Sequence, residues 1–127
     1  MMSPAKPRLI PIYTTRGDVG AILRYPYLFN PFGEWFGWVT ANREVYSIYG
    51  TYVGQISNEW RILRPRSLDS SHPTCLPPAN PGRIIPPANF PLPTLMPELA
   101  LNLLDVLEEA PGLLPTIDSG DFKPDME

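Results

Sequence analysis

The first half of the chain repeats one phrase of aromatic residues and glycines three times, over residues 12–22, 28–39 and 45–56. The second and third copies align at an offset of 17 residues. The first copy aligns at 16, with one residue missing between Gly17 and Gly20. A phrase repeated at nearly fixed spacing indicates one supersecondary unit used several times. The sequence therefore predicts a repeat architecture before any single element is assigned.

Each copy has the pattern of a β-hairpin. A run rich in β-forming residues leads to a short turn that contains a glycine, and a second apolar run follows. One glycine of each copy is expected in the turn with a positive φ. Another falls in the outgoing strand, where it indicates a bulge, a bend or a closely approaching backbone. The turn glycines are Gly17, Gly33 and Gly50, and the strand glycines are Gly20, Gly37 and Gly54.

The repeat continues for half a copy beyond the third. One further step of 17 residues aligns Leu63 with Phe29 and Tyr46 in the repeat, and the pattern fails after Ser67. This predicts a fourth incoming strand that lacks a returning one. Because an unpaired strand edge invites aggregation, we expect residues 8–10 to supply the missing pairing.

These phrases resemble the four-fold beta-flower domain, a family of small bacterial proteins built from four hairpin petals. The family phrase is aromatic-x-x-x-Gly-x-x-hydrophobic-Gly-x-hydrophobic. It is matched by Tyr13, Gly17, Val19, Gly20 and Ile22; by Phe29, Gly33, Phe36, Gly37 and Val39; and by Tyr46, Gly50, Val53, Gly54 and Ile56. The resemblance covers about half of the chain. It implies a hairpin fold and brings no agreed activity or catalytic set with it.

We therefore expect an all-β domain over residues 8–68, with three clear hairpins and a partial fourth in a small closed or pseudo-symmetric sheet. Twelve of the fourteen aromatic residues lie between Tyr13 and Trp60. A core drawn from so few residues is marginal, but each aromatic side chain can bury ~150 to 250 Å². The aromatic content compensates for the small size of the domain.

Residues 69–96 form a proline-rich arm. Proline makes up 18 of the 127 residues, and nine of these prolines lie between Pro73 and Pro97. Proline lacks an N–H donor and holds its predecessor extended, which excludes a central strand or a helix interior. The arm is predicted to adopt a polyproline II conformation. A Pro-Pro-Ala-Asn phrase occurs twice, nine residues apart, so that three whole turns separate the copies and both face the same way.

An amphipathic helix is predicted for residues 97–110, followed by an acidic tail over residues 111–127. Leu99, Leu103 and Leu107 share one face of this helix. Such a short helix is marginal alone, so we expect it to dock on its own domain, another subunit or a partner. The alternative is a disordered tether whose helix folds only on a partner. Residues 98–127 carry eight acidic residues against one lysine, whereas residues 1–67 carry eight basic residues against four acidic ones. The tail is therefore either solvated or laid over the basic domain.

The sequence offers no evident chemistry. His72 and Cys75 are the single histidine and the single cysteine, three residues apart in the arm. A zinc site needs three or four ligands, and a nucleophilic thiol needs a positioned base. We expect no catalytic, metal or cofactor-binding residues, and an exposed arm in which His72 and Cys75 are dispensable. The single cysteine and the lack of a long apolar run favour the cytoplasm and no membrane segment.

The expected function is a noncatalytic protein-protein interaction or scaffold module, acting on a protein partner or by self-association, with no small-molecule substrate evident. The candidate partner-binding residues are Trp35, Trp38, Tyr49, Tyr52, Leu99, Leu103 and Leu107. The alternative is a nucleic-acid-binding module. Its arginines and stacking residues would be Arg16, Arg24, Arg43, Arg61, Arg64 and Arg66 with Tyr25, Tyr27, Trp35 and Trp38. The net charge of residues 1–67 is +4, from eight basic and four acidic residues, and this is modest for a nucleic-acid-binding domain.

Overall fold

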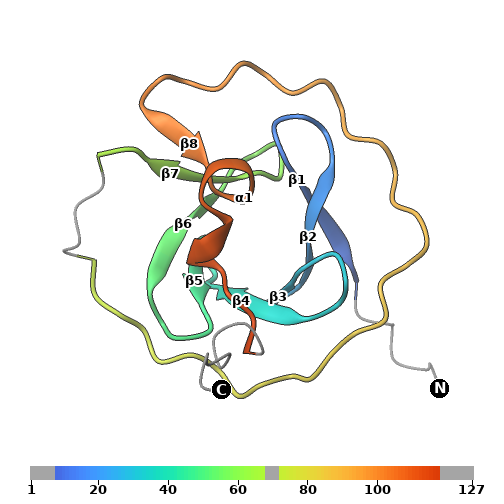
Figure 1. Cartoon of the computed structure of the whole chain (residues 1–127), viewed down its shortest axis with the longest axis vertical. Coiled ribbons are helices and arrows are strands. Elements are labelled where there is room, and N and C mark those ends of the chain that lie inside the picture. The colour runs from blue at the N-terminus through green and yellow to red at the C-terminus, as the bar shows by residue number, and fades with distance from the viewer. Residues whose placement is uncertain (1–7, 68–71, 118–127) are drawn as a thin grey trace, which may run out of the picture.

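One curled antiparallel sheet holds all eight strands, in the order in which they occur in the chain (Figure 1). This computed structural model describes residues 8–67 and 72–117. The strands are β1 (Ile10–Tyr13), β2 (Val19–Arg24), β3 (Tyr27–Phe29), β4 (Trp35–Val39), β5 (Glu44–Ser47), β6 (Tyr52–Ile56), β7 (Ile62–Pro65) and β8 (Leu103–Asp105). The sheet curls into a half-barrel with β1 and β8 at its edges. The prediction of an all-β fold of repeated hairpins is confirmed.

Four antiparallel pairs of strands form the units that we call the first to fourth petals. The hairpins β1–β2, β3–β4 and β5–β6 are the first three, and the fourth pairs β7 with β8, which are far apart in the chain. Figure 1 shows them arranged around a common centre. The predicted fourth incoming strand is β7. Its partner is β8, with Leu63 opposite Asp105 and Pro65 opposite Leu103. The expected pairing by residues 8–10 is wrong, because Ile10 continues directly into β1 and pairs with Leu23 of β2.

Strand register corrects the alignment of the first copy. Gly37 lies opposite Leu28 and Gly54 lies opposite Val45, but the residue that lies opposite Ile12 in the first petal is Ala21. Gly20 is instead the extra residue of a bulge, since Tyr13 pairs with Val19. No residue is therefore missing inside the first petal. The chain is one residue shorter in the connection from β2 to β3, which changes the offset from 17 to 16.

Five turns follow a single hydrogen-bonding design. The first residue donates its N–H to the carbonyl of the fifth, and its side-chain oxygen accepts from the N–H of the fifth. The fourth residue donates to the carbonyl of the first and has a positive φ. Thr, Asn or Ser at the first position suits this design, because a short polar side chain can bond to nearby backbone. The turns are 14–18, 30–34, 40–44, 47–51 and 57–61.

Glycine occupies the fourth position in the three turns at the petal tips, as predicted, with φ of 96° at Gly17, 88° at Gly33 and 87° at Gly50. In the two turns between petals this position holds Arg43, with φ of 67°, and Trp60, with φ of 65°. Residues other than glycine rarely adopt a positive φ.

The predicted helix over residues 97–110 is wrong in its first part. Leu103–Asp105 form β8, and α1 (Val106–Glu109) is a single turn followed by a 3-10 helix, η1 (Pro111–Leu113). The Asp105 carboxylate caps α1 by accepting from the N–H of Leu107, at 3.1 Å. A short apolar run fits either a helix or a strand, and here the free edge of β7 decided in favour of a strand.

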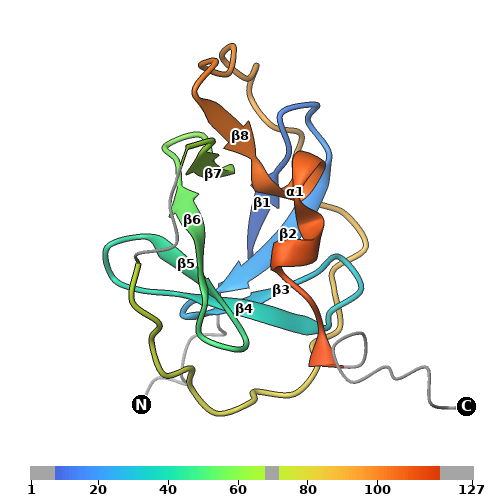
Figure 2. The same ribbon diagram turned by 60° about the vertical axis from the view of Figure 1, so that its left-hand side comes forward.

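The C-terminal segment completes the main core. Val106 is fully buried, and Leu114 packs in the same cluster as Ile12, Leu28 and Val53. Figures 1 and 2 show α1 over the centre of the curled sheet, between the petals. The segment therefore docks on its own β-domain in this structure. The acidic tail lies outside the described residues from position 118 on.

Residues 72–102, which we call the belt, run around the outside of the petals from the third to the first and on to β8 (Figures 1 and 2). The belt is extended, and its burial follows the three-residue period of polyproline II. The period is interrupted once, at the exposed Pro87, and Pro77 and Pro86 are half-buried outside it. The side chains that are buried or half-buried on this period are Cys75, Pro78, Pro81, Ile84, Phe90, Pro93, Met96 and Leu99. The belt is thus an attached part of the domain, and residues 69–71 of the predicted arm lie outside the described residues.

The belt meets successive petal tips at nine-residue intervals. The N–H of Cys75 donates to the carbonyl of Gly50 at 2.9 Å, and the N–H of Ile84 donates to that of Gly33 at 3.0 Å. A Cβ on either glycine would overlap the carbonyl oxygen of the belt residue that bonds to it. Nine residues later Pro93 lies beside Gly17, at 3.6 Å from the position of an added Cβ. The duplicated phrase therefore matches the spacing of the petals, roughly 28 Å of polyproline II per step.

We expect Gly37→Val and Gly54→Val each to destabilise the protein by more than the ~1 kcal/mol that is usual for a point mutation. A Cβ at Gly37 would lie 2.8 Å from the carbonyl oxygen of Tyr46, and one at Gly54 would lie 2.5 Å from that of Leu63. Chemical denaturation midpoints test this prediction. Ala41→Val, at an exposed site, is the control. Three similar midpoints would contradict it.

The belt register predicts opposite effects at two adjacent isoleucines. Ile84 is 9% exposed and packs with Phe29 and Trp35, whereas Ile85 is 91% exposed. Ile84→Asp should lower the free energy of unfolding by at least about 2 kcal/mol, because it removes apolar contacts and buries a charge. Ile85→Asp should have little effect. Equal stabilities of the two variants in thermal denaturation would show that the belt is not docked in this register.

Candidate functional site

The aromatic candidates from the sequence lie in different environments. Trp35 is buried, and its indole N–H donates to the carbonyl of Gly37 at 2.7 Å. Trp38 is half-buried and stacks on Tyr46, with 5.0 Å between ring centroids. Tyr52 is half-buried, while Tyr49 at the tip of the third petal is 57% exposed. Of these four, only Tyr49 has the exposure expected of a partner-binding side chain.

The leucine candidates belong to the intramolecular docking of the C-terminal segment. Leu103 lies in β8, and Leu107 packs against Gly20, where an added Cβ would be 2.8 Å from its Cδ1. Leu99 is half-buried at the end of the belt. The seven predicted residues therefore do not gather on one surface, because Leu107 packs against the core while Leu99 and Leu103 line the groove described below.

The outer side of the belt carries the most exposed apolar side chains of the described residues. Leu76, Ile85, Leu92 and Leu95 are 93%, 91%, 91% and 96% exposed, and we call them the belt ridge. Leu76 and Ile85 are equivalent residues of the duplicated phrase, each directly following an anchored residue. The nine-residue repeat in the sequence was a signal for this surface. It did not show which face of the belt stays exposed.

His72 and Cys75 are not free residues of an exposed arm. The imidazole of His72 stacks on Tyr52, with 3.9 Å between ring centroids, and Cys75 is anchored to Gly50 through its backbone. A side-chain hydrogen bond with Cys75 raises the pKa of Tyr46 from 10.0 to about 12, and burial and Glu44 add to this effect. Both residues help to hold the start of the belt against the third petal.

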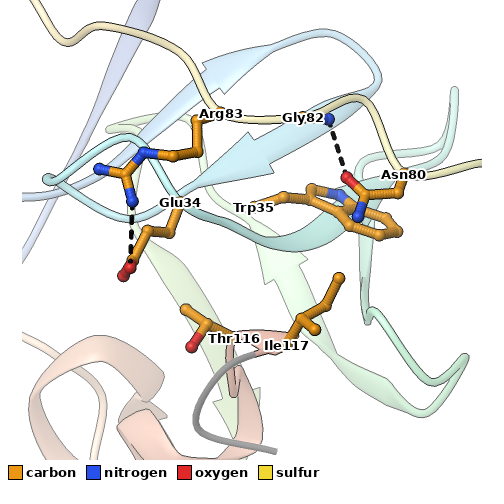
Figure 3. A pocket seen from close by; sticks show the side chains of 7 residues that line it. All are labelled: Glu34, Trp35, Asn80, Gly82, Arg83, Thr116 and Ile117. Carbon is orange, nitrogen blue, oxygen red and sulfur yellow. Dashed lines mark hydrogen bonds and ion pairs between the residues drawn. The ribbon is translucent and has the colours of Figure 1, made fainter. Parts of the chain in front are cut away.

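A hollow of about 210 Å³ lies where the second petal, the belt and the C-terminal segment meet (Figure 3). Its charged pair is satisfied internally, because Arg83 Nη1 lies 3.3 Å from Glu34 Oε2 and Arg83 Nη2 donates to the carbonyl of Phe32. Figure 3 shows Thr116 and Ile117 across the hollow from the belt residues. The side chains here bind one another and leave no evident charge for a ligand.

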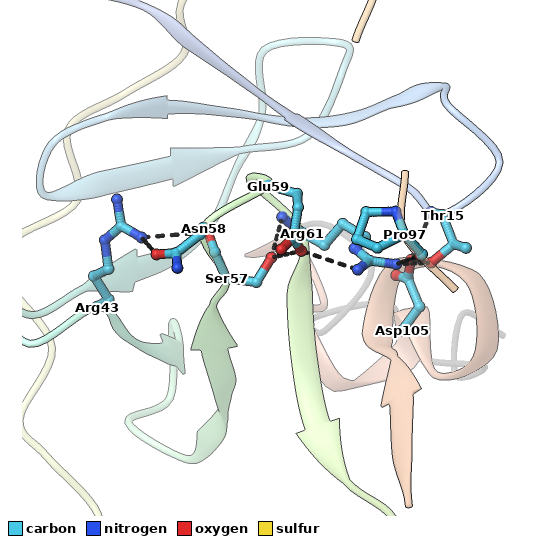
Figure 4. Close-up of polar contacts among 8 residues, drawn as sticks. All are labelled: Thr15, Arg43, Ser57, Asn58, Glu59, Arg61, Pro97 and Asp105. Atoms are coloured by element: carbon cyan, nitrogen blue, oxygen red, sulfur yellow. Dashed lines mark hydrogen bonds and ion pairs between the residues drawn. The ribbon is translucent and has the colours of Figure 1, made fainter. Parts of the chain in front are cut away.

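A larger groove of about 480 Å³ lies between the third and fourth petals and is bordered by the end of the belt. Its lining combines amide, charged and apolar side chains. It is lined by Asn42, Arg43, Gln55, Ile56, Ser57, Asn58, Glu59, Arg61, Leu63, Pro97, Glu98, Leu99, Ala100 and Leu103. Figure 4 shows a row of polar side chains that runs from Arg43 past the 57–61 turn to Asp105.

Arg61 is the buried cation of this row, at 3% exposed. Its Nη2 lies 2.9 Å from Glu59 Oε1, and its Nη1 donates to the hydroxyl of Thr15 and the carbonyl of Pro97. The Arg61 guanidinium lowers the pKa of the Glu59 carboxyl, with burial opposing and the Ser57 hydroxyl adding to the shift. Arg61 Nε is buried without a partner among the described residues. The row therefore joins the fourth petal to the belt.

Asp105 continues the row to the first petal. Its carboxylate is 1% exposed and accepts from both the N–H and the hydroxyl of Thr15, at 2.7 and 2.6 Å. The same carboxylate caps α1. A buried carboxylate is costly unless it is hydrogen-bonded, and these three donors meet that requirement. Asp105 thus fixes β8 and α1 against the first petal.

Arg43 and Trp60 are functional candidates that the sequence reading did not pair. The two residues are 17 apart and occupy the same position of the repeated turn. The Arg43 guanidinium stacks over the Trp60 ring at 4.9 Å, a cation–π contact. The recurrence of the Thr40 turn as the Ser57 turn is the signal from which this pair could have been found.

Within residues 8–67 and 72–117, no group of three or more histidine, cysteine, aspartate and glutamate side chains could hold a metal ion. No helix of the described part is long and apolar enough to span a membrane. Comparisons with protein-family models, with curated proteins and with solved structures gave no match.

The raised pKa of Tyr46 predicts a loss of stability in alkali. The folded state keeps this phenol protonated above the ordinary pKa of 10.0, so its stabilisation is complete below pH 10 and is lost as the pH rises towards about 12. Cys75→Ala removes the largest cause and should lower the pKa of Tyr46. Tyrosinate absorbance, with Tyr46→Phe to assign the transition, measures this value.

The control for this titration is Leu76→Ala, which alters the adjacent, 93% exposed residue and should leave the Tyr46 transition unchanged. An identical transition in Cys75→Ala and in the unaltered protein would contradict the assignment of the shift to the thiol.

Proposed function

We propose that this chain is a noncatalytic protein-binding module that presents its belt to a protein partner or to another copy of itself. The observation that carries this proposal is the belt ridge: four aliphatic side chains more than 90% exposed on a backbone that is pinned to the petals. Exposed apolar side chains spaced along one anchored segment suit a partner that is itself extended, because such a partner can cover several of them at once.

The physical advantage of such a surface is its low conformational cost. Polyproline II segments bind grooves lined by aromatic side chains with little loss of entropy, because the ligand is already extended. Anchoring by Cys75 and Ile84 restricts the belt further and leaves Leu76 and Ile85 pointing outward. Phe32 and Tyr49 at the tips of the second and third petals, 72% and 57% exposed, extend the apolar surface.

Membership of the four-fold beta-flower family and a cytoplasmic location are part of this proposal. Four petals around one centre support the first. A single cysteine, buried only in part, supports the second, because thiols persist in reducing compartments.

The arginines give little support to nucleic-acid binding, because five of the six candidates are engaged within the molecule. Arg24 stacks over Phe29 at 5.3 Å, Arg43 stacks over Trp60, and Arg61 is buried. Arg64 Nη1 donates to the carbonyls of Tyr52 and Val53, and Arg66 forms a two-bond ion pair with Glu109. Arg43 keeps Nε and Nη2 without a partner among the described residues, but such a cation does not by itself form a row of charges for phosphates.

The test is affinity capture from a native cell lysate with the full chain and the double variant Leu76→Ser/Ile85→Ser. A specific partner should be captured by the unaltered protein in a salt-tolerant manner and lost with the double variant, because two exposed apolar contacts are removed. The stability of the variant should be unchanged, since both side chains are exposed in the folded protein.

The matched control is Leu101→Ser, which alters an equally exposed leucine (94%) outside the duplicated phrase. Capture should survive this change. Equal capture by the double variant would refute the belt ridge as the binding surface, and capture of nucleic acid that falls steeply with added salt would favour the alternative function.

A further inference from the structure

We infer that the groove between the third and fourth petals is a second binding site, for a carboxylate carried on an apolar body, with the Arg43 guanidinium as its receptor. This site lies apart from the belt ridge and does not depend on the proposed function. It is built from the charge of Arg43, the turns that present it and the composition of the groove.

Arg43 takes part in none of the ion pairs of the described residues, which join Arg61 to Glu59, Arg66 to Glu109 and Arg83 to Glu34. Its Nη1 donates to the carbonyl of Ser57 at 3.3 Å and reaches Asn58 Oδ1 at 3.5 Å. Nε and Nη2 have no partner in the described part of the chain. These two donors form one edge of the planar guanidinium, which matches both oxygens of a carboxylate.

The protein holds this guanidinium in place at a cost to its backbone. Arg43 and Trp60 have φ of 67° and 65°, at the turn position where the petal tips have glycine. A left-handed conformation is unfavourable for a residue with a Cβ. The side chains of these two residues stack on each other, with 4.9 Å between Arg43 Cζ and the centre of the Trp60 ring. Backbone conformations of this kind concentrate at functional sites, and here they fix the orientation of a cation.

The remaining lining of the groove defines the ligand. The half-buried Leu63, Leu99 and Leu103 provide apolar contacts for its body. The groove also contains Glu59 and Glu98, so a ligand with several negative charges would be repelled. A single carboxylate on an aliphatic body therefore fits better than a phosphate or a nucleic acid.

Two sources could supply this chemistry: the carboxyl terminus of a peptide, or a small aliphatic acid. The amide side chains of Asn42, Gln55 and Asn58 line the same groove and could bond to peptide groups. An aliphatic acid has no such groups, so the two sources can be separated by experiment.

The experiment is an NMR titration of the full chain with N-acetyl-Leu-Leu, with its C-terminal amide and with hexanoate. N-acetyl-Leu-Leu should shift the Arg43 Nε–H and the backbone amides of residues 55–58 and 98–100 in a saturable and salt-weakened manner. The C-terminal amide should not. Binding by hexanoate as tight as that of the peptide identifies a small acid as the source, and weaker binding identifies a peptide terminus.

Arg43→Gln should weaken binding of the free acid at least about tenfold, the loss expected on removing a charge-assisted pair. Arg43→Lys, which keeps the charge and lacks the fork, should weaken it as well and serves if the glutamine variant does not fold. Arg83→Gln is the matched control, because Arg83 is exposed and lies at the second petal. The inference is overturned if the amide binds as tightly as the acid, if both Arg43 variants bind normally, or if neither acid gives saturable shifts up to about 10 mM.

Discussion

The pairing of β7 with β8 is the interaction on which the rest of the structure depends. Three petals are formed by neighbouring strands, but the fourth requires Leu103–Asp105 to return over a long stretch of chain. This pairing brings the Asp105 carboxylate to Thr15 and the side chains of Val106 and Leu114 into the core. It also fixes the far end of the belt. Without it β7 would be an open sheet edge and the centre of the petals would lack its cover.

The belt shows why proline suits a segment that must be bound without joining a sheet. A docked strand would pair alternate N–H groups with the sheet, whereas proline has no N–H and polyproline II forms no hydrogen-bonded ladder. The belt therefore needs few anchors, and those at Cys75 and Ile84 coincide with glycines that leave room for its backbone. Glycine thus has two roles at these tips: it adopts the positive φ of the turn, and its missing Cβ lets the belt backbone approach closely. In the two turns between petals the same position carries Arg43 or Trp60, whose carbonyls accept from the N–H of Ile56 at 2.9 Å and of Tyr13 at 2.7 Å.

The two proposed binding surfaces differ in physical character. The belt ridge is convex, apolar and repeated, and it suits a partner that covers an extended segment. The groove is hollow and mixed in polarity, and one cation in it lacks an acidic partner among the described residues. Both depend on the same construction, because the end of the belt borders the groove and its middle carries the ridge.

The amino-acid sequence by itself determined the repeated hairpins, the turn glycines and the extended arm, because those features follow from local spacing, φ preference and the missing N–H of proline. It also carried the nine-residue repeat of the belt. Only the tertiary structure decided that Leu103–Asp105 form a strand, since a short apolar run takes the conformation its neighbour stabilises. In the same way, long-range contacts decided that the predicted leucine face is divided between the core and the groove, that Ile84 is buried while Ile85 is exposed, and that Arg43 and Trp60 meet. The 17-residue repeat marks Arg43 and Trp60 as equivalent turn residues, and the nine-residue repeat marks the belt as periodic. Neither repeat states which side chains from distant segments pack together, and so those contacts had to come from the tertiary structure.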